Sequence, residues 1–175
     1  YKNKLEKSGF KENSINVIEE TTIRILNRLK TSTIPGKPIK GLVIGNVQSG
    51  KTANMAALMS MAADVGWNVF IVLSGTIENL RVQTQKRFLN DLHSETANIN
   101  WQLLDNVKVG TGIQPDQLYL NETSNTRYFA VCLKNSTRLK NLLKWLNRDK
   151  NKKKQMKILL IDDEADQAGI NSANI

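Results

Sequence analysis

The chain has 175 residues, of which 40% are hydrophobic, and its 25 Lys and Arg outnumber its 16 Asp and Glu to give a net charge of +9. This length and composition suit one globular domain and exclude wholesale disorder. No apolar run approaches the roughly 20 residues that span a bilayer, and the N-terminus does not resemble a signal peptide. A single cysteine excludes a disulfide framework and favours a cytoplasmic location.

The first predicted element is an amphipathic helix from about Asn13 to Lys30, where apolar residues recur at helical spacing. It is followed by the segment TSTIPGKP, whose prolines and glycine break a helix and form a linker. We therefore expect an N-terminal helical segment over residues 1–38 and a second unit over residues 39–175. Because the chain opens at Tyr1 and ends in polar sequence, we also expect it to be a fragment of a longer protein.

The second unit alternates between short apolar runs and helical patterns. Strands are predicted at Gly41–Ile44, Val69–Leu73, Tyr128–Leu133 and Ile158–Ile161. Helices are predicted at Lys51–Val65, at about Glu78–Leu92, and at Ser136–Leu146 with a face of Leu139, Leu142, Leu143 and Leu146. Between Ser94 and Arg127 the pattern is weaker, with a short strand at Val107–Val109 and a turn with a short helix at Pro115–Leu120. This alternation predicts an α/β fold, a mostly parallel sheet with helices on both faces.

The sharpest motif lies between the first predicted strand and the first helix of this unit. It fits G-x-x-x-x-G-K-[ST] and consists of Gly45, Asn46, Val47, Gln48, Ser49, Gly50, Lys51 and Thr52. Its glycines let main-chain N–H groups point at an anion, and the helix N-terminus adds a favourable dipole. Lys51 can reach the β- and γ-phosphates of a nucleotide, and the Thr52 hydroxyl can ligate Mg²⁺. The motif therefore predicts a nucleotide phosphate site, which makes Lys51 a catalytic candidate as well.

The second motif is the strand Ile158–Ile161 followed by Asp162, Asp163, Glu164, Ala165 and Asp166. A parallel strand presents functional groups at its carboxyl end, the edge where the phosphate loop also lies, so the two motifs should converge. Asp163 is assigned to Mg²⁺, with Asp162 as its competitor, because sequence does not decide which of the two faces the loop. Glu164 is assigned to orient the attacking water and to accept its proton. A water-positioning Glu favours nucleotide hydrolysis over transfer to an acceptor hydroxyl.

These motifs resemble those of a known family. GKT at 50–52 with the DEAD sequence at 163–166 is similar to motifs I and II of superfamily II helicases. The closer resemblance is to the Z-one domain proteins, bacterial helicase-like ATPases that are often described as endonucleases. It is carried by GNVQSGKTAN at 45–54, by LLIDDEAD at 159–166 with the small-residue and Asn stretch that follows, and by the segment from Leu73 to Gln85.

The resemblance implies a RecA-like P-loop ATPase domain that uses ATP and Mg²⁺ in a bacterial restriction or anti-phage defence system. It implies a second RecA-like domain beyond this chain, and partners such as Hsp90/MutL-type ATPases and DNA-modification or nuclease proteins. Because that second domain supplies arginine fingers, we expect the chain alone to hydrolyse ATP slowly. No nuclease residues are recognisable in the sequence. The alternative function is a nucleotide-gated scaffold of a defence complex that does not move along DNA.

DNA is the expected macromolecular partner, although the charge of +9 supports it only weakly. The densest basic run, Arg148–Lys157, precedes the acidic strand and is interpreted chiefly as a solvated loop away from the nucleotide edge. By resemblance, better candidates for nucleic-acid contact are Ser74, Gly75, Thr76 and Arg81, with Gly110–Gly112 as a further candidate. Capping of the following helix by Ser74 or Thr76 is an equally good interpretation. Cys132 and the three tryptophans are interpreted as core residues.

Overall fold

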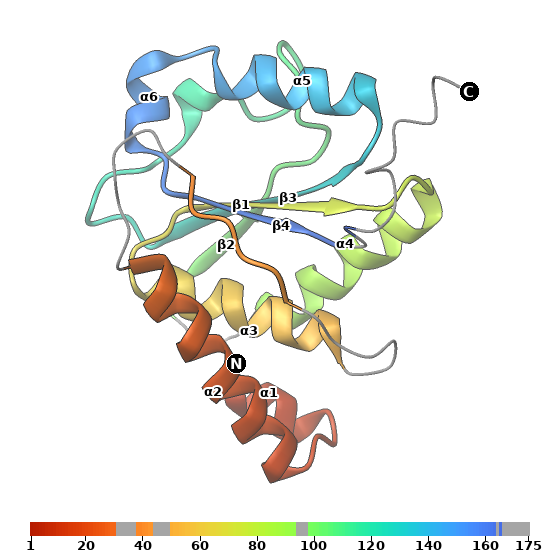
Figure 1. Cartoon of the computed structure of the whole chain (residues 1–175). Coiled ribbons are helices and arrows are strands. Elements are labelled where there is room, and N and C mark those ends of the chain that lie inside the picture. Colours follow the sequence, from red (N-terminus) through yellow and green to blue (C-terminus); the bar gives the residue numbers. More distant parts are fainter. Residues whose placement is uncertain (31–37, 44–49, 94–97, 164, 166–175) are drawn as a thin grey trace. The chain divides into compact units, whose positions relative to one another are not determined.

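The structure, a computed structural model, describes residues 1–30, 38–43, 50–93, 98–163 and 165 (Figure 1). The chain divides into two compact units, Tyr1–Val65 and Gly66–Ile175. No helix within these described ranges has the length and apolar character that crossing a membrane requires.

The first unit contains α1 (Lys2–Lys7), α2 (Glu12–Lys30) and α3 (Lys51–Asp64). The predicted helices at 13–30 and 51–65 are thus confirmed, whereas the short α1 was not predicted. The apolar stripe of α2 explains the packing, because Ile15 and Ile18 are buried together with Leu5 of α1 and Ala53 of α3. Small side chains on α3 allow this close approach of helices.

The predicted strand at Gly41–Ile44 is wrong over its described part. Residues 41–43 have no strand structure, and Ile44 lies outside the described residues. Leu42 and Val43 are 76% and 63% exposed, so the apolar run that predicted a strand buries little of its surface. An apolar run becomes a strand only where a neighbouring strand pairs with its main chain, and these residues are not among the strands of the sheet.

The second unit is built on a sheet of β1 (Val69–Ser74), β2 (Asn100–Leu103), β3 (Thr126–Leu133) and β4 (Ile158–Asp162). The strand order is β2-β3-β1-β4, and all three pairings are parallel. This arrangement confirms the predicted α/β class with a parallel sheet, and three of its strands lie where the apolar runs predicted them. The fourth, β2, was not predicted; the expected strand at Val107–Val109 contributes only an isolated bridge between Lys108 and Thr111.

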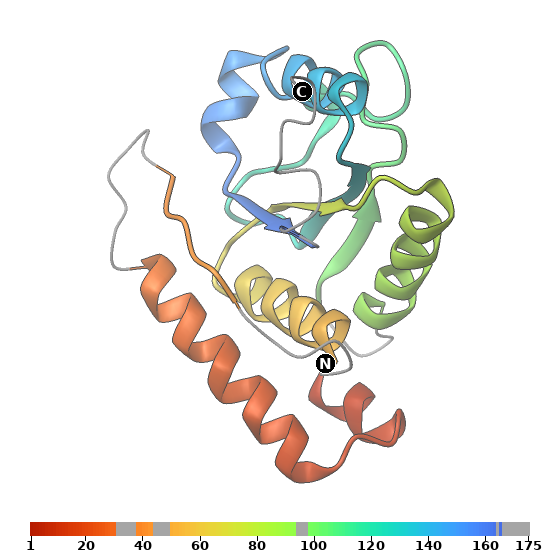
Figure 2. The same cartoon turned by 45° about the vertical axis from the view of Figure 1, so that its right-hand side comes forward.

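Helices cover both faces of this sheet, α5 (Ser136–Leu146) and α6 (Lys150–Gln155) on one face and α4 (Glu78–Leu92) on the other (Figures 1 and 2). The predicted helices at 78–92 and 136–146 are confirmed, and Pro115–Gln117 forms the expected short helix, η1. The basic run before β4 forms α6 instead of a loop, with Asp149 capping its N-terminus by accepting from the N–H groups of Asn151 and Lys152.

The main core of this unit lies between the sheet and α5. Alternate residues of β1 and β3 point into it, including Val69, Ile71 and Tyr128, and Trp145 of α5 fills it from the helix side. On the opposite face Phe70 and Phe129 flank Trp101. The ring centroid of Trp101 lies 5.0 Å from that of Phe70 and 6.2 Å from that of Phe129. Because β1 is central and buried on both faces, its carboxyl end is held in a fixed position relative to those of β3 and β4.

Candidate functional site

The described part of the phosphate-loop motif lies at the start of α3. Gly50 is the N-cap in the left-handed conformation, with φ of 68°, and as a glycine it has no side chain that could cap the helix. A left-handed N-cap favours glycine, and the first-turn N–H groups of a helix are suited to binding an anion. Lys51 is exposed and Thr52 is half-buried. These features fit a bound phosphate, whereas residues 45–49 lie outside the described residues.

The acidic motif begins where β4 ends. Asp162 is the last strand residue, and Asp163 follows it in a turn while its N–H donates to the Leu73 carbonyl of β1 at 2.9 Å. The parallel ladder therefore continues one residue past β4 and places both aspartates at the carboxyl edge of the sheet. Oxygen ligands at such an edge fit Mg²⁺. Glu164 and Asp166 lie outside the described residues.

Asp162 already has a partner that the sequence analysis did not identify. Lys134, the residue directly after β3, places its Nζ 2.9 Å from Asp162 Oδ1 and 2.9 Å from the main-chain oxygen of Asp163. Only 7% of the Lys134 side chain is exposed, against 40% of Asp162. In the sequence, Lys134 is recognisable as a lysine at the end of a buried strand. Its pairing with Asp162, however, depends on the order of the strands in the sheet.

The predicted convergence of the two motifs stays a prediction. Gly50, Lys51 and Thr52 belong to the first unit, and Asp162 and Asp163 belong to the second. In the ranges that the structure describes, no group of three or more His, Cys, Asp or Glu side chains is arranged to hold a metal ion.

The four residues predicted to contact nucleic acid differ in their accessibility. Ser74 is buried and donates from Oγ to the Cys132 carbonyl, Gly75 is also buried, and Thr76 is exposed. Arg81 donates from Nε and Nη2 to Glu78 Oε1 at 2.9 and 2.7 Å. It also donates to the Gln85 side chain and to the Val131 carbonyl. Only Thr76 of the four is therefore placed to present its side chain to solvent without first losing an internal partner.

The hydrogen bond between Glu78 and Arg81 dominates the electrostatics at the start of α4. It lowers the pKa of Glu78 and raises the pKa of Arg81. At β3, burial raises the pKa of the Cys132 thiol to about 11, so this half-buried cysteine is held in its neutral form at neutral pH. The prediction that Cys132 packs with the core is confirmed.

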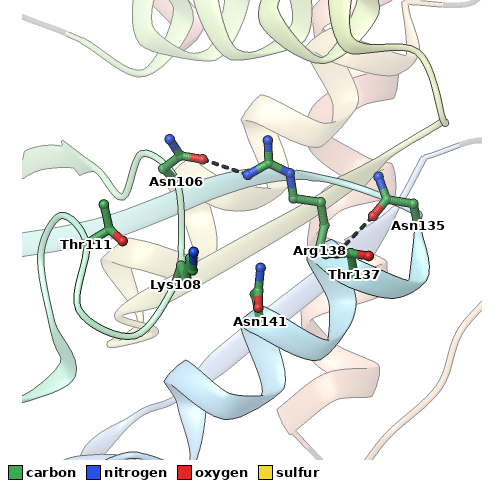
Figure 3. A pocket seen from close by; sticks show the side chains of 7 residues that line it. All are labelled: Asn106, Lys108, Thr111, Asn135, Thr137, Arg138 and Asn141. Carbon is green, nitrogen blue, oxygen red and sulfur yellow. Dashed lines mark hydrogen bonds between the residues drawn. The ribbon is translucent and has the colours of Figure 1, made fainter.

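A pocket of about 620 Å³ opens between the loop after β2 and the start of α5 (Figure 3). Among the described residues its lining consists of two cations, three amides and two hydroxyls: Lys108, Arg138, Asn106, Asn135, Asn141, Thr111 and Thr137. Arg138 Nη1 donates to Asn106 Oδ1 at 2.7 Å, which joins the loop to the helix across the pocket. Such a lining is suited to an anionic, hydrogen-bonding ligand.

The loop side of the pocket is held in place from beneath by Gln114, which is 8% exposed. Its Nε2 donates to the carbonyls of Lys108, Thr111 and Gly112, and its Oε1 accepts from the N–H of Gly110 and from Arg148. Gly110 and Gly112 have φ of 81° and 62°, and a Cβ on Gly112 would lie 3.1 Å from the Asp105 carbonyl oxygen. Glycines are therefore needed for this loop conformation, and of the predicted Gly110–Gly112 segment Thr111 lines the pocket.

Comparisons with protein-family models, with curated proteins and with solved structures find no match to this chain. The features that bear on function are therefore the parallel α/β sheet, the GKT sequence at the start of α3 and the aspartates at the end of β4.

Proposed function

We propose that this chain binds and hydrolyses ATP with Mg²⁺, as the first RecA-like half of a helicase-like, DNA-associated ATPase. The observation that carries the proposal is the position of Asp162 and Asp163 at the carboxyl end of a parallel strand. Ligand sites of open α/β sheets lie at this edge. The left-handed Gly50 before Lys51 and Thr52 supports a phosphate site as the second component.

In the proposed reaction, Lys51 and the first N–H groups of α3 bind the phosphates and stabilise the charge that develops on them. Thr52 and Asp163 would hold Mg²⁺, which would neutralise part of the phosphate charge. Glu164 orients the attacking water and accepts its proton. A second RecA-like domain in a longer protein would complete the cleft, and the defence-system partners implied by the family resemblance belong to the same proposal.

DNA is proposed as the macromolecular partner because of the polar pocket between the loop after β2 and the start of α5. Lys108 and Arg138 provide positive charge, and the surrounding amides and hydroxyls provide donors that suit phosphodiester oxygens. In the basic run before β4, three of the basic side chains have internal partners. Arg148 donates to Gln114, Lys152 to the Leu118 carbonyl and Lys153 to Asn147.

The decisive experiment is a calorimetric titration of the full-length protein with ATP and Mg²⁺. Lys51→Ala should weaken binding about 10-fold or more, since it removes a charged hydrogen bond to phosphate. Lys40→Ala is the matched control, because Lys40 is also an exposed lysine of the first unit. Equal affinity of the Lys51→Ala variant and the unaltered protein would contradict the phosphate site.

Steady-state hydrolysis by the full-length protein tests the catalytic part. Glu164→Gln should retain nucleotide binding and lose about 100-fold or more in turnover, the usual contribution of a general base. The rate is measured with and without single- and double-stranded DNA. Stimulation by DNA supports the motor function, whereas hydrolysis that is unaffected by DNA favours the nucleotide-gated scaffold.

A further inference from the structure

Lys134 connects the carboxyl ends of three strands. Its Nζ donates to the carboxylate of Asp162, the last residue of β4, and to the main-chain oxygen of Asp163, the next residue. Its own main-chain N–H donates to the carbonyls of Ser74 and Gly75, at the end of β1, at 3.2 and 3.0 Å. Only 7% of its side chain is exposed, so the bonds that Nζ makes to Asp162 and Asp163 replace part of the hydration that the ammonium has lost.

The register of the sheet explains why Lys134 meets Asp162 and not the neighbouring aspartate. Asp162 pairs with Leu73, and Leu73 pairs with Cys132; both of these partners pack against the core beneath α5. Side chains alternate between the two faces of a sheet, so Asp162 and Lys134 extend from the α5 face. Asp163 continues the ladder one residue further and is assigned by the same alternation to the opposite face.

This arrangement separates two carboxylates that are adjacent in sequence and otherwise equivalent as metal ligands. The ion pair with the Lys134 ammonium stabilises the Asp162 carboxylate in its present position. Moving the Asp162 carboxylate onto a metal would break its ion pair with the buried Lys134 ammonium, which is unfavourable. Groups that orient a ligand from behind influence metal affinity nearly as much as the ligands themselves.

Resting on the proposed function, we infer that Lys134 is a positioning residue of the acidic motif. It retains Asp162 as its own ion-pair partner, leaves Asp163 as the carboxylate that ligates Mg²⁺, and fixes the main chain at Asp163 through the carbonyl oxygen. The sequence left open whether Asp162 or Asp163 ligates the metal. In this inference Lys134, which precedes the two aspartates by 28 and 29 positions, decides between them.

The test measures the Mg²⁺ concentration that half-saturates binding of a non-hydrolysable ATP analogue to the full-length protein. Asp163→Asn and Lys134→Met should each raise it about 10-fold or more, the usual effect of losing a ligand or its orienting partner. Asp162→Asn, whose amide oxygen still accepts from Lys134, should change it little. Lys134→Arg should lie closer to the unaltered protein than Lys134→Met does. Lys140→Met, at an exposed lysine of α5, is the matched control.

The inference is overturned if Asp162→Asn raises the half-saturating Mg²⁺ concentration as much as Asp163→Asn, or if Lys134→Met matches the unaltered protein. Thermal melting without nucleotide separates loss of folding from loss of positioning. If Lys134→Met does not fold, the comparison of the two aspartate variants decides the question. If the unaltered protein shows no Mg²⁺-dependent binding, the proposed function and this inference both fall. Normal binding with no effect of Lys134→Met overturns only the inference.

Discussion

The indole N–H of Trp145 donates a hydrogen bond of 2.9 Å to the main-chain carbonyl of Ile113, 32 residues earlier in the chain. Trp145 lies on α5 and is 1% exposed, and Ile113 belongs to the loop that forms one side of the polar pocket. One side chain therefore packs the core and also fixes the distance between that loop and the helix facing it.

Trp145→Phe should destabilise the protein by about 1–3 kcal/mol, because the Ile113 carbonyl loses its donor and the smaller ring leaves a gap. Trp145→Ala should cost about 3–5 kcal/mol. Equilibrium denaturant unfolding measures both values. Leu143→Ala, on the same helix and 59% exposed, serves as the control and should stay near the unaltered protein. A Trp145→Phe variant of unchanged stability would show that the hydrogen bond contributes nothing.

Asn68 should be the most sensitive polar residue at the beginning of β1. It is 7% exposed, and its side chain donates to the Gln155 carbonyl and accepts from the Lys157 N–H, at 2.9 and 2.8 Å. Asn68→Ala leaves two main-chain groups without these partners and should cost about 2–3 kcal/mol in denaturant unfolding. Asn68→Asp keeps the acceptor and should be less destabilising. Asn151→Ala, an exposed site on α6, should have little effect.

Cys132 should make stability depend on pH in the alkaline range. Burial raises its pKa from 9.0 to about 11, so the unfolded chain loses the thiol proton at lower pH than the folded protein does. Stability from this group is complete below about pH 9 and falls as pH rises toward 11. Cys132→Val should remove this part of the pH dependence. A thiol reagent at pH 8 should react much faster after unfolding, and equal rates would contradict the burial effect.

The polar pocket should contribute to DNA binding through Lys108 and Arg138. Lys108→Gln and Arg138→Gln should each weaken binding of a single-stranded oligonucleotide, and each should reduce the salt dependence by about 0.7 in the log–log slope. Lys140→Gln, on α5 but outside the pocket lining, is the charge-matched control. If the control weakens binding equally, the effect is one of net charge. If Lys150→Gln or Lys154→Gln on α6 has the larger effect, the contact lies elsewhere.

Local sequence patterns predicted those elements whose formation depends on residues close together in the chain. The periodicity of α2, α4 and α5 and the apolar runs of β1, β3 and β4 identified them with small errors at their ends. The pattern was less reliable where burial depends on a distant partner. Leu143 belonged to the predicted face of α5, yet it is 59% exposed, and Trp145 fills the core instead. The short edge strand β2 and the exposed run at Leu42 and Val43 were misjudged for the same reason.

The sequence by itself supplied the chemical groups of the proposed site, because the GKT motif and the adjacent carboxylates are recognised from residue type and spacing. Tertiary structure decided which of these groups have partners. Lys134 meets Asp162 only because β3 and β4 flank β1 in register, and the polar pocket combines residues 106–111 with residues 135–141. Ser74 and Arg81 were candidates for DNA contact by residue type. In the structure, however, Ser74 is buried and donates to the Cys132 carbonyl, and Arg81 donates to the Glu78 carboxylate. Such pairings depend on strand order and register, which no local pattern encodes.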